Sequence, residues 1–122
     1  MYQGFEELEV WKLSMENSKG VIKLIQDNFP KYHPLADQLI RSAISVPSNI
    51  AEGSERNTNV DFQRFLYISK GSNAELKTQL ILAKDFCNPN FTLVIESMIT
   101  KTDSVSKMLF KLIRSLNITP KT

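Results

Sequence analysis

The chain has 122 residues, of which 42% are hydrophobic and 23% are charged, a length and composition typical of one folded domain. Its formal net charge of +2 is too small for the strong basic bias of a dedicated nucleic-acid binder, although it permits a polyanionic partner. The single cysteine, Cys87, excludes an internal disulfide, and no cluster of cysteine and histidine offers metal ligands.

The first predicted helix runs from about residue 5 to residue 28. Its apolar and small residues recur at alternating spacings of three and four, which is the pattern of a helix that packs along its whole length. We expect Pro30 to end this helix, because proline disfavours helical continuation. The inward stripe predicted for it is Leu8, Trp11, Met15, Ser18, Ile22, Ile25 and Phe29.

The second predicted helix covers about residues 34–53. Pro34 suits the first helical position, where its missing N–H has no partner to bond. Pro47 removes one backbone hydrogen bond inside the helix, so we expect a kink or a loosened turn there, between residues 43 and 48. Gly53 is predicted to cap the C-terminus. The inward stripe is Leu35, Leu39, Ser42, Val46 and Ile50.

The third predicted helix covers about residues 59–87. Thr58, followed three positions later by Asp61, resembles a capping box. Small residues at positions 69–74 predict a close crossing with residues 42–45 of the second helix. The inward stripe is Phe62, Leu66, Ser69, Asn73, Leu76, Leu80 and Ala83.

The fourth predicted helix covers about residues 91–117, and residues 119–122 are expected to fray. Its inward stripe is Phe91, Ile95, Met98, Thr102, Val105, Leu109, Leu112 and Leu116. The connections between the four segments are short, and short connections force neighbouring helices to be antiparallel. The sequence therefore predicts an all-α, antiparallel up-down-up-down four-helix bundle that forms a single domain over residues 1–122.

The chain lacks the residue patterns of the common catalytic and metal sites. A di-metal carboxylate site in a bundle needs Glu-x-x-His pairs on facing helices, and the one histidine, His33, lies in a turn without a carboxylate three positions before it. The four glycines do not cluster into a phosphate-binding loop. We expect no catalytic residues, no metal, no cofactor and no enzymatic activity, with Cys87 as a packing residue.

The sequence also predicts a soluble, cytoplasmic protein. No apolar run approaches the roughly 20 residues that a membrane span needs. The first eleven residues carry Glu6, Glu7 and Glu9 instead of the basic, apolar leader of a secreted protein. A single cysteine also fits a reducing compartment.

Two basic stripes are the best indication of a partner. Lys70, Lys77 and Lys84 recur every seven residues on the third helix, and a second group follows on the fourth helix. Such stripes could neutralise phosphates, but lysines also simply solvate the outer face of most bundles. The candidate nucleic-acid-binding residues are Arg41, Arg56, Arg64, Lys70, Lys77, Lys107, Lys111 and Arg114.

Residues 41–53 are the most unusual segment, because polar side chains alternate with apolar ones around Pro47. These side chains could satisfy the carbonyl that the proline frees. They could instead form a polar network that fixes helix register or a subunit contact. The candidate members of that network are Gln38, Ser45, Asn49, Glu52, Ser72 and Glu75.

The segment 45–53, with the sequence SVPSNIAEG, resembles the signature of the bacterial four-helix bundle family encoded in 23S rRNA intervening sequences. Gln38 and Arg41 before it and Arg56 after it fit the same signature. Residues 8–11 (LEVW) and 29–30 (FP) are similar to the family as well, as are residues 65–66 (FL) and 71–76 (GSNAEL). The order and spacing match over residues 5–86, while the fourth helix matches only in its apolar pattern.

The resemblance implies a relation to the accessory variability protein of diversity-generating retroelements, a homopentameric bundle whose basic surface engages nucleic acid and a reverse transcriptase. The implied partners are therefore further copies of the chain, forming a homopentamer, RNA or DNA, and a reverse transcriptase. The chain departs from the pattern in its short turn at residues 31–34 and in Lys77, where glutamate is common. We expect a non-enzymatic homo-oligomeric scaffold that binds nucleic acid through basic helix faces. The alternative is a protein–protein interaction module without direct nucleic-acid binding.

Overall fold

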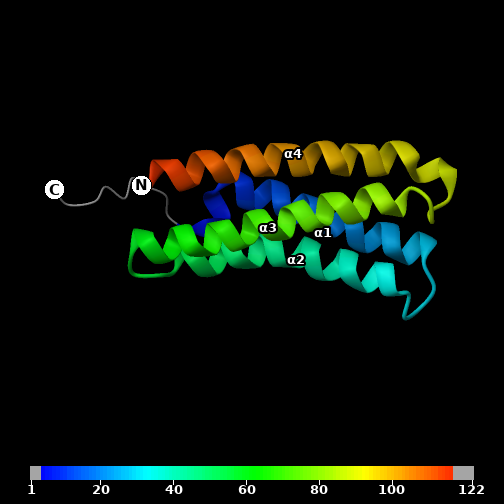
Figure 1. The fold of residues 1–122 in the computed structure, drawn as a ribbon, viewed down its shortest axis with the longest axis horizontal. Helices are drawn as coiled ribbons and strands as arrows, with labels where there is room; N and C mark the ends of the chain where they lie inside the picture. Colours follow the sequence, from blue (N-terminus) through cyan, green and yellow to red (C-terminus); the bar gives the residue numbers. More distant parts are fainter. Residues whose placement is uncertain (1–3, 117–122) are drawn as a thin grey trace.

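A computed structural model of the chain describes residues 4–116 as an elongated bundle of four α-helices with two short 3₁₀ helices (Figure 1). Each long helix packs against the next along the chain, and α1 and α4 close the bundle. No strand occurs within these residues. The predicted all-α four-helix bundle is confirmed. The elements are η1 (Phe5–Glu7), α1 (Glu9–Asn28), α2 (Pro34–Ser54), α3 (Asn59–Ala83), η2 (Pro89–Phe91) and α4 (Thr92–Ser115).

The helix ends differ from the predicted ones by a few residues. The predicted first helix is divided, because Leu8 has an extended backbone that separates η1 from α1. The third helix ends at Ala83 instead of residue 87, and a turn leads from it to η2. Thr58 does cap α3, since its Oγ1 accepts a hydrogen bond from the Asp61 backbone N–H at 3.2 Å. The tail predicted at residues 119–122 lies outside the described residues.

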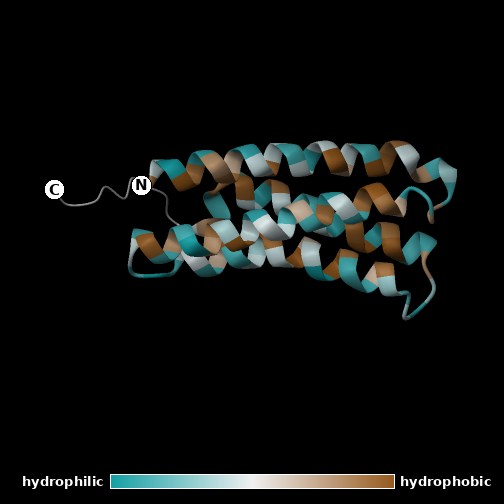
Figure 2. Ribbon diagram, viewed as in Figure 1, coloured by the Kyte–Doolittle hydropathy of each residue, from teal (hydrophilic) through white to brown (hydrophobic). Residues whose placement is uncertain are grey.

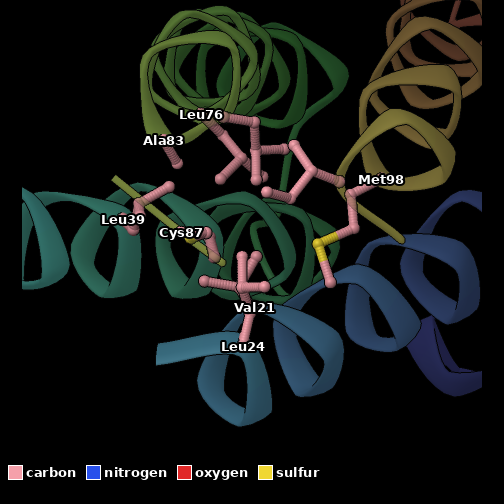
Figure 3. Packing of buried hydrophobic residues seen from close by; sticks show 10 residues of the cluster. Val21, Leu24, Leu39, Leu76, Ala83, Cys87 and Met98 are labelled. Atoms are coloured by element: carbon pink, nitrogen blue, oxygen red, sulfur yellow. The ribbon is translucent and has the colours of Figure 1, made fainter. Parts of the chain in front are cut away.

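The core consists of two apolar clusters, one toward each end of the bundle. In the cluster near the α1–α2 turn, side chains from all four helices converge, among them Val21, Leu39, Leu76 and Met98 (Figure 3). The cluster at the other end is built in the same way around Leu66. Hydropathy alternates along each helix because only part of each surface faces this interior (Figure 2).

Buried polar residues separate the two apolar clusters along α1, α3 and α4. Asn17 Nδ2 donates to the Met98 carbonyl at 3.2 Å, and Asn73 Nδ2 donates to the Thr102 carbonyl at 2.8 Å. Ser69 Oγ donates to the Val46 carbonyl at 2.8 Å. Each bond joins a side chain to the backbone of a neighbouring helix. Because a buried donor without a partner costs free energy, these bonds favour one axial register of the helices.

The predicted inward stripes of α2, α3 and α4 are mostly buried, but the stripe predicted for α1 was wrong. The residues of α1 that face the interior are Val10, Ser14, Asn17, Ser18, Val21 and Leu24. Of the predicted stripe only Ser18 is buried, while Trp11 and Met15 are partly exposed and Ile22 is exposed. The error arises because α1 carries apolar residues on two sides, and its polar residues occupy part of the interior.

Helix α2 continues without interruption through Pro47, so the loosened turn expected there is absent. A proline at position 47 cannot donate to the carbonyl of Ala43. Ser18 Oγ on α1 donates to that carbonyl at 2.7 Å. A neighbouring helix thus supplies the hydrogen bond that the proline removes.

Gly53 lies inside α2 instead of capping it, because the helix ends at Ser54. A Cβ added to Gly53 would lie 2.7 Å from the Cβ of Phe65 and 3.0 Å from Cδ1 of Phe62. The glycine therefore lets α2 and α3 approach closely. The close approach predicted from small residues of α3 is also seen, since Ser69 and Ser72 face α2 through hydrogen bonds.

Candidate nucleic-acid interface

Three of the six residues predicted as a polar network, Ser45, Asn49 and Ser72, form a hydrogen-bonded chain between α2 and α3. Ser45 Oγ and Ser72 Oγ are 2.7 Å apart, and Asn49 Nδ2 donates to Ser45 Oγ at 3.0 Å. Two residues missed by the sequence analysis extend the contact, since Ser42 Oγ donates to Gln79 Oε1 at 2.6 Å. This part of the network joins two helices of the same chain.

The other three members of the predicted network lie apart from it. Glu52 Oε2 accepts from Arg56 Nη2 at 2.8 Å, within α2 and the turn that follows. Gln38 and Glu75 are exposed, and neither makes a hydrogen bond or ion pair within residues 4–116. The carbonyl freed by Pro47 is satisfied by Ser18 of α1, a donor outside the predicted network.

Two of the predicted phosphate-binding cations are neutralised near the α2–α3 turn. The Arg56 and Arg64 guanidinium carbons lie 4.7 and 5.1 Å from the Phe65 ring centroid. Arg56 also pairs with Glu52, and Arg64 pairs with Asp61 at 3.3 Å. Since both pairs join residues three or four positions apart at the surface, each contributes little stability. They do reduce the net charge available to a phosphate.

The lysines of α3 divide into two kinds. Lys77 pairs with Asp103 of α4 at 2.8 Å, and Lys84 pairs with Glu96 of α4 at 3.3 Å. Lys70 makes no ion pair with any described residue. The stripe predicted on α3 thus supplies two bridges to α4 and one unpaired cation.

Lys70 lies instead with the basic residues of α4. A hollow of about 380 Å³ between α3 and α4 is lined by Lys70, Ser106, Lys107, Phe110 and Lys111. Neither Lys107 nor Lys111 forms an ion pair in the described part of the chain. Asp103 lies one helical turn before Lys107 but pairs with Lys77, so the only acidic residue near the hollow on α4 is engaged elsewhere. The hollow therefore gathers three unpaired ammonium groups. We call it the basic hollow.

Arg114 and Phe110 complete this surface. The Arg114 guanidinium carbon lies 5.6 Å from the centroid of the Phe110 ring, in a cation–π arrangement. Phe110 is 51% exposed. Sequence analysis missed Phe110 and Ser106, although Phe110 lies three residues after Lys107 and four before Arg114, on the same face of a helix. Arg41 is exposed on α2, which contributes no residue to the hollow.

Two further features of the described residues concern metal ions and the single cysteine. No group of three or more His, Cys, Asp or Glu residues in residues 4–116 is arranged to hold a metal ion. Burial raises the pKa of the Cys87 thiol above its usual value, which lowers the fraction of reactive thiolate. Within the same residues, no helix is long and apolar enough to cross a membrane.

A family model described as 23S rRNA-intervening sequence protein matches residues 6–111. The fold is also that of a protein of unknown function from Bacteroides thetaiotaomicron, whose crystal structure is assigned to the S23 ribosomal protein family. The two chains are 22% identical with a TM-score of 0.75, and the match covers 86% of this chain and 98% of the other. No curated protein matches the chain.

Proposed function

The chain belongs to the 23S rRNA-intervening sequence protein family, and from this membership together with the basic hollow we propose that it is a non-enzymatic, homo-oligomeric scaffold that binds nucleic acid. The family is the one expected from residues 45–53. The sequence analysis expected nucleic acid to bind basic helix faces in general, and the proposal restricts that binding to α3 and α4. Contact with RNA or DNA would take place in the cytoplasm.

The observation that carries the proposal is the convergence of unpaired cations on one side of the bundle. Lys107, Lys111 and Arg114 span seven residues of α4, which correspond to about 10 Å along the helix axis. One strand of a duplex presents a phosphate every 3.4 Å or so along its axis, so the span covers about three phosphates. Lys70 contributes a fourth cation from α3. Each phosphate contact would release counterions, which favours binding at low salt.

The outer side of α3 supports the homo-oligomeric part of the proposal. Exposed residues recur there at spacings of four and three, and three of them are large apolar residues: Val60 (59% exposed), Tyr67 (61%) and Ile81 (51%). The positions between them include Gly71 and Ala74. A surface helix is normally polar on its outer side, whereas the outer side of α3 carries these apolar residues beside the polar Arg64 and Thr78. We define the outer stripe of α3 as Val60, Tyr67, Gly71, Ala74 and Ile81.

A second apolar surface lies on a different side of the bundle. A groove of about 380 Å³ between α1 and α2 is lined mainly by carbon atoms, and its apolar side chains include Trp11, Met15 and Ile44. Trp11 and Met15 are residues of α1 that the sequence analysis assigned to the interior. The outer stripe of α3 on one copy could fill this groove on the next. Such a head-to-tail contact closes into a ring when the rotation between copies permits it. The proposed number of five copies in the ring comes from the resemblance to the accessory variability protein.

The nucleic-acid part of the proposal is tested with a pair of variants of equal charge. Lys107→Gln with Lys111→Gln removes two cations from the basic hollow. Lys23→Gln with Lys31→Gln removes two exposed lysines from α1 and the turn after it. Fluorescence anisotropy of labelled structured RNA and duplex DNA measures affinity. We expect the hollow variant to bind both ligands at least tenfold more weakly than the control variant, because each lost phosphate contact lowers affinity at any sequence.

Equal affinity for the two variants would contradict the assignment of the hollow. The alternative function, a protein–protein module without nucleic-acid binding, would then rest on the outer stripe of α3 and the α1–α2 groove. The exposed apolar residues of these two surfaces favour a protein–protein module.

The resemblance to the accessory variability protein adds a reverse transcriptase as a proposed partner. Purified reverse transcriptase of a diversity-generating retroelement, mixed with the full chain, should elute with it in size-exclusion chromatography. Separate elution at micromolar concentrations would contradict this partner while leaving the nucleic-acid proposal in place.

A further inference from the structure

Phe110 is a large aromatic residue in a place where neither the core nor a membrane explains it. Its ring is 51% exposed. It is absent from the partly buried residues that pack against either core cluster, although its α4 neighbours Met108 and Leu112 are among them. The residues that share its hollow are lysines and a serine. Half of the ring surface is open to solvent, so a ligand with a flat apolar face would gain free energy by covering it.

The neighbours of Phe110 fit a ligand that has both charge and a flat apolar face. Lys107 and Lys111 lie beside the ring on α4, and Lys70 faces them from α3. The Arg114 guanidinium lies 5.6 Å from the ring centroid and so holds a cation next to the ring. Nucleotides combine an anionic phosphate with a planar base, and single-strand binding proteins place bases on aromatic side chains beside basic residues.

We propose that Phe110 is a stacking platform for one unpaired nucleobase, so that the basic hollow prefers single-stranded nucleic acid over a duplex. This inference rests on the proposed function and specifies its ligand. In a duplex the bases are stacked on one another inside the helix, and the ring can reach only phosphates and sugars. In a single strand or loop one base can turn outward onto the ring while its flanking phosphates contact the lysines.

The test uses the full chain with a fluorescent single-stranded RNA of mixed sequence, the same strand as DNA, and a blunt RNA duplex of equal length. Phe110→Ala is compared with wild type and with Phe86→Ala, which removes another exposed ring, in the turn after α3. We expect Phe110→Ala to weaken single-strand binding about tenfold and to leave duplex binding unchanged. RNA and DNA strands should respond alike, because every base has a flat face. Phe110→Trp should restore binding.

A second readout reports on stacking itself. The fluorescent base 2-aminopurine in the single strand should be quenched by wild type and less quenched by Phe110→Ala at saturating protein. Equal loss of single-strand and duplex affinity, or no loss in either, would overturn the stacking role while the electrostatic proposal survives. A changed oligomer mass for Phe110→Ala would assign the ring to a contact between copies and also overturn the inference. If wild type binds none of the three ligands, both the inference and the proposed function fail.

Discussion

Ser18 on α1 donates to the carbonyl of Ala43, the acceptor that Pro47 leaves without its helical donor. A second buried serine, Ser69, donates to the carbonyl of Val46. Both bonds connect α2 to a neighbouring helix through its backbone. At the scale of single residues, the buried side chains of Asn17, Ser18, Ser69 and Asn73 therefore pair with backbone carbonyls of other helices, and the proline inside α2 is accommodated by one of these bonds.

Replacing Ser18 tests this account of Pro47. Ser18→Ala leaves the Ala43 carbonyl buried without a donor, so the free energy of unfolding should fall by about 1–3 kcal/mol. Urea denaturation followed by circular dichroism measures the change. Thr100→Ala is the control, because its hydroxyl bonds to the Glu96 carbonyl on an exposed surface, and we expect a change below about 0.5 kcal/mol. Similar losses for the two variants would show that the Ser18 bond has no special role.

The close approach of α2 and α3 depends on a single missing methyl group at Gly53. Gly53→Ala should lower the free energy of unfolding by about 1 kcal/mol or more, because the new Cβ would overlap Phe65 and outweigh alanine's helix propensity. Gly71→Ala makes the same chemical change where the added Cβ would meet, within 4 Å, no described atom beyond the neighbouring residues and backbone of its own helix. In dilute, monomeric protein it should raise the free energy of unfolding by up to about 1 kcal/mol. Stabilisation by both variants would contradict the close approach.

At the scale of the helices, hydrophobic periodicity predicted most of the fold. It placed α2, α3 and α4 with their inward residues, because those stripes are apolar or small along nearly their whole length. It failed on α1, where Asn17 and Ser18 face the interior and Trp11 and Met15 line a surface groove. The carbonyls that accept from Asn17 and Ser18 belong to other helices, so periodicity within α1 could not reveal them.

The sequence named the individual cations of the candidate site, but it did not predict which of them would lie together on one surface. Arg56 and Arg64 have acidic partners four and three positions away, a spacing that the sequence analysis did not use. The pairing of Lys77 with Asp103 joins residues far apart in the sequence, and only the packing of α3 on α4 reveals it. The same packing brings Lys70 to the basic hollow. Charge counting therefore found the cations, and the fold showed which of them remain available to a phosphate.

At the scale of the whole molecule, the arrangement of charge matters more than its sum. The formal net charge is +2. Lys70, Lys107, Lys111 and Arg114 nevertheless gather on the α3–α4 side without an acidic partner among residues 4–116, while Lys77 and Lys84 of α3 pair with carboxylates. A local group of this kind attracts a polyanion at low salt even when the molecule is nearly neutral.

The outer stripe of α3 and the apolar α1–α2 groove lead to a prediction about how copies of the chain assemble. Tyr67→Glu with Ile81→Glu places charges in the outer stripe of α3 without touching the core. We expect sedimentation equilibrium to give a smaller mass for this variant than for wild type, because burying unpaired charges in an interface is unfavourable. Ser97→Glu with Thr100→Glu, at two exposed positions of α4, serves as a control for added charge away from this stripe. An unchanged mass, with helicity intact, would contradict the assignment of this stripe to an interface.

Nucleic-acid binding by the α3–α4 cations is tested most directly by the salt dependence of RNA and DNA binding by the wild-type chain. Anisotropy titrations of labelled structured RNA and duplex DNA from about 50 to 200 mM salt give the slope of log affinity against log salt. We expect micromolar binding at low salt and a steep negative slope, which falls in magnitude by about two in the Lys107→Gln, Lys111→Gln variant. No binding at about 50 mM salt, or a slope that the variant leaves unchanged, would contradict the claim that the α3–α4 cations hold nucleic acid.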